Sequence, residues 1–232
     1  MKAGRKYRDA AAKVEAEKLY TLDEAVKLVK ETSFTKFDAS IEIHMNLGID
    51  PRQAEQQIRA TVALPHGTGK TVKVIAFVGD DNIDEAKKAG AIEAGNETLV
   101  TKIQEGWLDF DKAVATPDMM KQIAKIARTL GQAGKMPNPK AGTVGLDISK
   151  MVGEIMKGQV EYRNDKFSNL HNVVGKASFS EEHLKENLVT YLKAVQDKKP
   201  DKMKGIYIKS ITLAASMGPG IPVEVNTTIS EL

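Results

Sequence analysis

The chain has 232 residues, of which 41% are hydrophobic and 28% are charged, and its formal net charge at pH 7 is +3. This composition is typical of a folded protein with one large domain or two smaller ones, and the absence of cysteine excludes disulfides, thiolate catalysis and cysteine metal sites. No apolar run approaches the roughly twenty residues of a membrane helix, and the first residues lack the apolar core of a secretory signal, so we expect a cytoplasmic protein with no membrane contact.

The first part of the chain predicts one helix and two strands. Thr21 and Glu24 have the spacing of a capping box, which begins a helix with an apolar stripe of Ala25, Leu28 and Val29. Segment 37–49 then alternates as a half-buried strand does. Its apolar face carries Ile41, Ile43, Met45 and Leu47, and its polar face carries Glu42, His44 and Asn46. Segment 57–64 alternates again, and the short connection predicts that these two strands pair antiparallel.

The middle of the chain changes to alternating strands and helices. Strands are expected over 71–80, 91–95 and 110–117, and helices over 82–90, 97–106, 118–131 and 147–158. Strands and helices that alternate with short loops are typical of a parallel α/β sheet covered on both faces.

The last part returns to antiparallel patterns. Strands are expected over 159–165 and 172–179, followed by a helix from Ser180, its expected N-cap, to residue 195. The apolar stripe of this helix consists of Leu184, Leu188, Tyr191 and Val195. A long strand over 206–216 and another over 217–225 end the pattern.

These elements predict a two-domain fold that combines α/β and α+β classes. An antiparallel α+β domain contains residues 1–66 and 159–232, and a Rossmann-like α/β domain of residues 67–158 is inserted into it. Two chain crossings would form a two-stranded hinge whose glycines permit motion. The expected hinge residues are Pro65, His66, Gly67, Gly69 and Gly158.

Catalytic patterns are weak. Gly69-Lys70-Thr71 matches the end of a phosphate-binding loop, but Leu64 occupies the early glycine position and a strand, not a helix, is expected next. Asp80 and its neighbouring carboxylates suit magnesium in principle, although an acid-rich helix start explains them more simply. The histidines form no zinc pattern, and no serine lies in a GxSxG elbow. We therefore expect no enzyme activity, metal or cofactor.

Features suited to nucleic acid are subtler. The two-residue period of 206–216 places Ser210, Thr212 and Ser216 on one face of a strand, where small hydroxyls can bond to phosphates and ribose. An ordinary solvated sheet face explains this pattern equally well. Lys36-Phe37 begins the first strand with a cation and an aromatic ring, a pair that is also common at a strand end. A nucleotide-dependent enzyme and a DNA-binding regulator remain alternatives, although no helix-turn-helix or zinc pattern supports the second.

Longer motifs carry a family resemblance over nearly the whole chain. They are FDASIEIHMNLGIDPRQAEQQIRATVALPHGTGK, KMPNPKAGTV, YRNDK followed by LHNVVGKASF, and SMGPG. In combination and order they resemble the L1 family of bacterial large-subunit ribosomal proteins. The resemblance implies a terminal domain that binds the stalk region of large-subunit rRNA, an inserted Rossmann-like domain and a two-stranded hinge. It also implies binding to the protein's own operon mRNA, which represses translation, and help in releasing deacylated tRNA from the exit site of the ribosome.

The resemblance also implies which residues contact RNA. The positions that match the family motifs, together with the hydroxyl row, are Lys36, Phe37, Glu42, His44, Lys166, Lys176, Ser178, Ser210, Thr212, Ser216, Met217 and Gly218. No catalytic residue or cofactor is implied, and the free protein is expected to be a monomer. Two positions depart from the family pattern: Ser216 replaces the usual threonine, and Phe167-Ser168 stands where a glycine is usual.

Overall fold

The structure is a computed structural model that describes residues 4–15, 17–200, 203 and 205–230. It contains two compact units, one of residues 1–69 and 160–232 and one of residues 70–159. Residues 1–3, 16, 201–202, 204 and 231–232, which belong to the predicted terminal domain, lie outside the described residues. Within the described ranges, no helix combines the length and apolar character that a membrane span needs.

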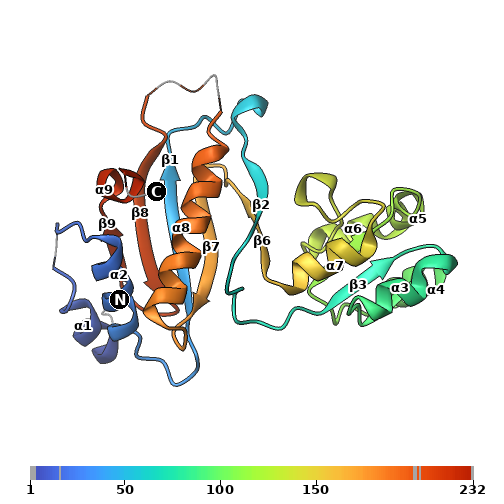
Figure 1. Cartoon of the computed structure of the whole chain (residues 1–232), viewed down its shortest axis with the longest axis horizontal. Coiled ribbons are helices and arrows are strands. Elements are labelled where there is room, and N and C mark those ends of the chain that lie inside the picture. Colours follow the sequence, from blue (N-terminus) through green and yellow to red (C-terminus); the bar gives the residue numbers. More distant parts are fainter. Residues whose placement is uncertain (1–3, 16, 201–202, 204, 231–232) are drawn as a thin grey trace. The chain divides into compact units, whose positions relative to one another are not determined.

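The first unit contains a four-stranded antiparallel sheet of order β7-β1-β8-β9 and a separate two-stranded sheet of β2 and β6 (Figure 1). Its strands are β1 (Ser40–Leu47), β2 (Arg59–Ala63), β6 (Gln159–Arg163), β7 (Asn169–Lys176), β8 (Ile208–Ala215) and β9 (Gly220–Val223). Its helices are α1 (Arg5–Ala11), α2 (Leu22–Glu31), the short 3-10 helix η1 (Ala54–Gln56), α8 (Glu181–Asp197) and α9 (Val225–Ser230).

Local sequence signals determine where the main helices begin. The capping box of α2 is confirmed, because the Thr21 hydroxyl accepts from the Glu24 amide and the Glu24 carboxylate accepts from the Thr21 amide. Ser180 caps α8 as expected by accepting from the amide of His183. The predicted apolar stripe of α8 is completely buried in the core that α2 and α8 form with the four-stranded sheet.

Buried tyrosines complete the other end of α8. The last carbonyls of a helix have no partner within the helix. Tyr162 donates its hydroxyl hydrogen to the carbonyl of Ala194 at 2.9 Å, and Tyr207 donates to the carbonyl of Val195 at 3.0 Å. Burial raises the pKa of Tyr162 to about 12, so its hydroxyl stays a donor at any physiological pH. The helix end is thereby joined to β6 and to the segment before β8.

Asn187 is a buried polar residue of α8 that joins three chain segments. Its side-chain carbonyl accepts from the backbone amide of His66 at 3.1 Å, and its amide group donates to the carbonyls of Gly67 and Val174 at 2.9 and 2.8 Å. The side chain is fully buried, and all of these bonds lie within the first unit. Asn187 therefore anchors the segment after β2 to both α8 and β7.

The predicted pairing of the strand at 37–49 with the strand at 57–64 is wrong. β1 pairs with β7 on one side and β8 on the other, so no edge of β1 is left for β2. β2 pairs instead with β6, where Arg59 and Glu161 form an ion pair of 2.6 Å and Asn164 exchanges hydrogen bonds with the backbone of Ile58. The alternation of segment 57–64 predicted one apolar side of Ile58, Ala60, Val62 and Leu64. Of these, Ile58, Val62 and Leu64 are buried and Ala60 is only partly buried.

The second unit is a three-stranded parallel sheet of order β4-β3-β5, as the alternation of strands and helices predicted. Separate apolar clusters cover its two faces, one containing residues of α4 and α6 and the other residues of α3 and α7. Its strands are β3 (Val74–Phe77), β4 (Glu93–Gly95) and β5 (Lys112–Ala115). Its helical segments are η2 (Asp80–Asn82), α3 (Ile83–Lys88), α4 (Glu97–Gln104), α5 (Met120–Ile123), η3 (Ala124–Ile126), α6 (Ala127–Gln132), η4 (Pro139–Ala141) and α7 (Ile148–Met156).

The single helix expected over 118–131 is divided by the 3-10 turn η3. A 3-10 helix has three residues per turn, so side chains three positions apart lie above one another. Ile123 and Ile126 have this spacing and are both buried in the same cluster. Both isoleucines thus stay in the core although the helix is interrupted.

The bonds of Asn187 lead to a stability prediction. We expect Asn187→Ala to lower the free energy of unfolding of the first unit by about 2–4 kcal/mol, because buried backbone groups lose their partners. All five tyrosines lie in the first unit and the only tryptophan, Trp107, lies in the second. The urea midpoint followed by the near-UV tyrosine signal should therefore fall, whereas the midpoint followed by Trp107 fluorescence should not change. Lys193→Ala, at an exposed site of the same helix, is the control; equal midpoints for the two variants would contradict the anchoring role.

Candidate nucleic-acid interface

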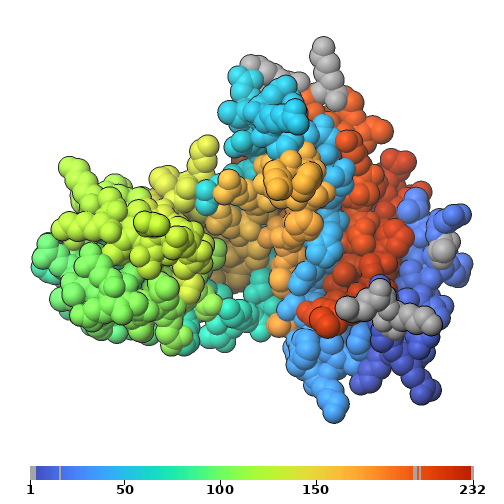
Figure 2. All heavy atoms as spheres, turned by 180° about the vertical axis from the view of Figure 1, so that it is seen from behind, coloured from blue at the N-terminus to red at the C-terminus, as the bar shows by residue number. Residues whose placement is uncertain are grey.

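The four-stranded sheet has one buried face and one open face. Ile41, Ile43, Met45 and Leu47 of β1 are at most 1% exposed, which confirms the predicted alternation. Glu42, His44 and Asn46 point the other way and are half-buried. Figure 2 shows atoms of β1 at the surface between those of β7 and β8. We call this side of the sheet the open face.

Polar side chains cross the middle of the open face in register. His44 lies opposite His171 on β7 and Thr212 on β8, and Asn46 lies opposite Asn169 and Ser210. The Nδ1 atoms of His44 and His171 are 2.9 Å apart, so one ring donates and the other accepts. The Asn46 amide donates to the Asn169 side-chain oxygen at 2.7 Å. The structure thus brings His44, Thr212 and Ser210 together, with Glu42 3.7 Å from the other nitrogen of His44.

The surroundings of His44 favour its neutral form by lowering its pKa. Burial, together with the charge of the neighbouring His171, lowers the pKa of His44 below the usual histidine value, and Glu42 only partly offsets this. The centre of the open face therefore carries hydrogen-bonding groups with little fixed positive charge near neutral pH.

Ser40 organises the end of the open face where β1 begins. The Lys176 ammonium donates to the Ser40 hydroxyl at 2.9 Å, and the Ser216 hydroxyl accepts from the Ser40 amide at 3.1 Å. Ser178 bonds to the Asp38 carboxylate through both its amide and its hydroxyl. Lys176 at the end of β7, Ser178 just after β7 and Ser216 just after β8 therefore gather at this end of the sheet.

Exposed apolar side chains border this same end. Phe37 is 60% exposed just before β1, and Met217 is 74% exposed just after β8. Met217 has a φ of +66°, in the left-handed region that a non-glycine residue rarely adopts. The Gly218 amide closes this turn by donating to the Ala215 carbonyl at 2.8 Å. Lys36 is also exposed here, so a cation, an aromatic ring and a thioether are available to a ligand.

Lys166 lies at the opposite end of the strands. It precedes β7 and its ammonium is 5.2 Å from the centre of the Phe167 ring, which is 68% exposed. Ser168 adopts a left-handed φ of +67°, and its buried hydroxyl donates to the Ile49 carbonyl. The Asp165 carboxylate accepts from the amides of Phe167 and Asn169, which stabilises the loop. The structure therefore does not place Lys166 beside Lys176.

The expected hinge residues lie just after β2 and α7, and Gly69 packs against Lys176. Gly67, Gly69 and Gly158 all have left-handed φ values, which glycine adopts readily. The boundaries between the two compact units fall at 69/70 and 159/160. The sequence analysis placed these boundaries at 66/67 and 158/159. The bonds of Asn187 to His66 and Gly67 hold these residues, with the preceding Pro65, in the first unit.

Lys70 does not lie in a phosphate-binding loop. Its ammonium forms an ion pair of 2.6 Å with Asp111, and the chain continues into strand β3 instead of a helix. Asp80 accepts from the Asn96 side chain at 3.0 Å. Among the residues that the structure describes, no group of three or more histidines or carboxylates is arranged to hold a metal ion.

Several polar residues of the open face were not predicted from the sequence to contact RNA. They are Ser40, Asn46, Asn169 and His171, and each lies opposite another polar residue on the neighbouring strand. The alternation of 37–49 gave the correct face for Asn46. The partners on β7 require the register of a strand more than a hundred residues later, which no local pattern supplies.

Comparison with known proteins identifies the family. The model of the Ribosomal protein L1p/L10e family matches residues 29–219. The chain belongs to this family. Proteins named large ribosomal subunit protein uL1 are similar over almost the whole chain: 52% identity in Salinispora tropica (97% of this chain, 95% of the relative), 51% in Thermobifida fusca (98% and 97%) and 52% in Chloroflexus aggregans (96% and 95%). Because the members of this family are ribosomal proteins, the prediction that the chain is not an enzyme is confirmed.

The His44 environment gives a pH prediction for this family member. NMR titration should place the pKa of His44 below the ordinary value of about 6.5. His171→Gln should raise it by removing a competing positive charge, whereas Glu42→Gln should lower it further. The unfolded chain binds this proton at higher pH than the native protein does, so stability should fall as pH drops from about 6.5 towards the native pKa. A shift of the same sign in both variants would contradict the assigned causes.

Proposed function

We propose that the protein is a structural component of the large ribosomal subunit that binds the stalk region of large-subunit rRNA through the open face. The observation that carries this proposal is the row of hydroxyl, amide and imidazole groups across β7, β1 and β8, with exposed Phe37 and Met217 at one end. The family and the names of its relatives support the ribosomal location and the rRNA partner.

The chemistry of the open face suits RNA better than a DNA duplex. RNA is recognised largely by shape, 2′-hydroxyls and unpaired loop bases, because its deep major groove is closed to side chains. Ser210 and Thr212 supply short hydroxyls, and Lys36 and Lys176 supply cations for phosphates. Phe37 offers a surface on which a base or ribose can stack. The sequence carries no helix-turn-helix or zinc pattern of the kind that major-groove readers use.

Two further roles follow from the same surface. A stem-loop in the protein's own operon mRNA that imitates the rRNA site would occupy the open face, so free protein would repress its own translation. Free protein would exist as a monomer with this face available. Once assembled in the ribosome, the protein would help deacylated tRNA leave the exit site.

We also propose that residues 70–159 form a separate domain that moves about a two-stranded hinge. The boundaries of the compact units and the left-handed glycines Gly69 and Gly158 support this proposal. A side chain at Gly69 would meet Lys176 Cγ at 2.7 Å and the Phe179 ring at 3.0 Å. The hinge would therefore lie after Gly69, because Gly69 itself packs within the first unit. Such motion suits a protein that must accompany a departing tRNA.

A salt titration with two RNAs tests the main proposal. One RNA is a fragment of the stalk helix with its loop, and the other is a matched duplex without the loop. We expect tight binding of the first that persists at moderate salt, and weak binding of the second that falls steeply with salt. Equal and purely electrostatic binding of both RNAs would contradict shape-specific recognition by the open face.

A substitution of Met217 tests whether this end of the sheet contacts RNA. Met217→Asp should weaken binding of the stalk fragment by about tenfold or more, about 1.4 kcal/mol, because a carboxylate would face the RNA backbone. Folding should be unaffected, since the side chain is exposed and aspartate tolerates a left-handed φ. Leu146→Asp also replaces an exposed apolar side chain by a carboxylate, at an 84% exposed position of the second unit, and this variant should bind as the unmodified protein does. Unchanged affinity of Met217→Asp would remove this end of the sheet from the site.

A further inference from the structure

The net positive charge of the protein is concentrated in the short helix α1 and the residues next to it. Residues 4–13 contain four cations and one carboxylate, and their net charge of +3 equals that of the whole chain. Once these five groups are set aside from the 34 cations and 31 carboxylates, thirty of each sign remain. A surplus of charge confined to one basic segment indicates a nucleic-acid or membrane partner for that segment.

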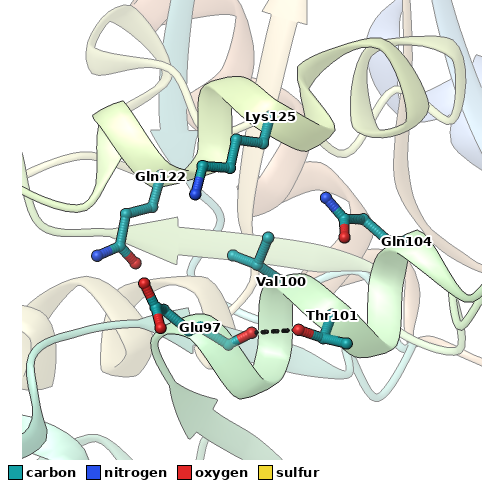
Figure 3. Close-up of a pocket in the computed structure, with 6 residues that line it drawn as sticks. All are labelled: Glu97, Val100, Thr101, Gln104, Gln122 and Lys125. Carbon is teal, nitrogen blue, oxygen red and sulfur yellow. Dashed lines mark hydrogen bonds between the residues drawn. The ribbon is translucent and has the colours of Figure 1, made fainter.

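The second unit, in contrast, is close to electrical balance. Its thirteen lysines and arginines are accompanied by twelve aspartates and glutamates. The polar pocket between α4 and α5 illustrates this balance, because Lys125 and Glu97 both line it and the Gln122 side chain points toward Glu97 (Figure 3). The surplus of α1 is therefore not part of a general basic surface.

Helix α1 is anchored to the first unit. Ala10 is buried, and Val14 packs against the core that α2 and α8 form with the four-stranded sheet. The Lys13 ammonium donates to the Glu31 carbonyl at the end of α2, at 3.4 Å. The amide of Glu15 donates to the Tyr20 hydroxyl at 2.9 Å. The cations of α1 are therefore held at a fixed place on the first unit.

That place is the end of the sheet where the proposed RNA site lies. A groove of about 290 Å³ separates α1 from the end of α2, with Lys6 on one side and Phe34 on the other. Phe34 comes three residues before Phe37, the exposed ring that borders the open face. Figure 2 shows the dark-blue atoms of α1 beside the lighter blue segment that leads into β1. An RNA held at Phe37 would therefore pass close to α1.

Arg5 and Arg8 lie on the free side of α1. They are three positions apart, so they are neighbours one turn apart on the helix surface, on the side away from buried Ala10. Arg5 is 4.0 Å from the Asp9 carboxylate, but both side chains are highly exposed, and such ion pairs are weak. A guanidinium binds two phosphate oxygens through parallel hydrogen bonds. The free side of α1 thus offers two phosphate ligands.

The side chains of α1 suit RNA better than a membrane surface. A helix that lies on a membrane inserts a broad apolar face beside its cations. Tyr7, which is 39% exposed, is the large apolar side chain of α1 that reaches the surface, and the other apolar residues of the helix are alanines. The phosphates of an RNA stem require only cations at a suitable spacing.

We propose that Arg5 and Arg8 bind backbone phosphates of the double-helical stem that adjoins the RNA loop held by the open face. This inference rests on the proposed function and extends its site by a contact that the predicted site residues do not include. The stem presents regular rows of phosphates, so α1 would add affinity there. Selectivity would remain with the open face.

The test compares two stalk fragments that share the same loop. One has the full adjoining stem, and the other keeps only the base pairs next to the loop. We expect Arg5→Gln/Arg8→Gln to bind the long fragment about tenfold more weakly, with a salt slope lower by about two, because two phosphate contacts are lost. Binding of the trimmed fragment should change by at most about twofold. Glutamine favours helix and both sites are exposed, so the unfolding midpoint should stay the same.

Two matched variants control for charge and for position. Arg5→Lys/Arg8→Lys keeps both charges, so it should keep the salt slope while losing part of the affinity for the long fragment. Lys193→Gln/Lys199→Gln removes the same charge from exposed positions near the C-terminal end of α8 and should bind both fragments as the unmodified protein does. Vesicles of equal parts phosphatidylcholine and phosphatidylglycerol should not bind the protein measurably.

Three outcomes would overturn the proposal. They are an unchanged affinity of Arg5→Gln/Arg8→Gln for the long fragment, an equal loss for both fragments, and tight vesicle binding that this variant abolishes. The unmodified protein is also tested with the matched duplex that lacks the loop. If it fails to prefer the stalk fragment over that duplex, the proposed function fails and this inference with it. If the preference holds and the arginine variant binds normally, only the role of α1 is removed.

Discussion

One-sided burial of the four-stranded sheet is the constraint on which the first unit depends. Side chains alternate along β1, so the register that buries Ile41, Ile43 and Met45 also directs Glu42, His44 and Asn46 to the open face. A slip by one residue would exchange the two sets and place charge in the core. Core packing and the arrangement of the candidate RNA site are therefore consequences of the same register, and selection for either preserves both.

The irregularity in the pairing of β1 and β7 contributes to the same surface. The register shifts between Ile41 and Glu42, so that Ser40 comes to lie opposite Lys176. Irregularities of this kind bend a strand and redirect its side chains near functional sites. Here it allows Lys176 to reach the Ser40 hydroxyl, while Ser216 binds the backbone of Ser40 from the other side. A cation and a hydroxyl from distant parts of the chain thus meet at one serine.

Sequence analysis predicted what depends on local chemistry and failed where distant segments choose partners. The capping box at Thr21, the N-cap at Ser180 and the faces of β1 depend on residues within a few positions of one another. The partner of β2 depends on which edges of β1 are already paired, and alternation reveals a face without revealing a neighbour. The pair of His44 and His171 joins positions 127 residues apart, so neither its geometry nor its lowered pKa could be read locally. The role of Asn187 was missed for the same reason, since one asparagine within a helical pattern gives no sign of bonds to two other segments.

The modest net charge of +3 places a physical limit on how this protein can recognise RNA. A strongly basic surface gains affinity from released counterions for almost any nucleic acid, with little selectivity. The open face instead holds the pKa of His44 low and keeps its cations near the ends of the strands, while its centre presents hydroxyl, amide and imidazole groups. These groups lose their hydration on contact and regain hydrogen bonds only when ribose, phosphate and base atoms lie in matching positions. Because little long-range attraction would compensate for a mismatch, the affinity proposed for this surface would come from fit, and fit is what distinguishes one folded RNA from another.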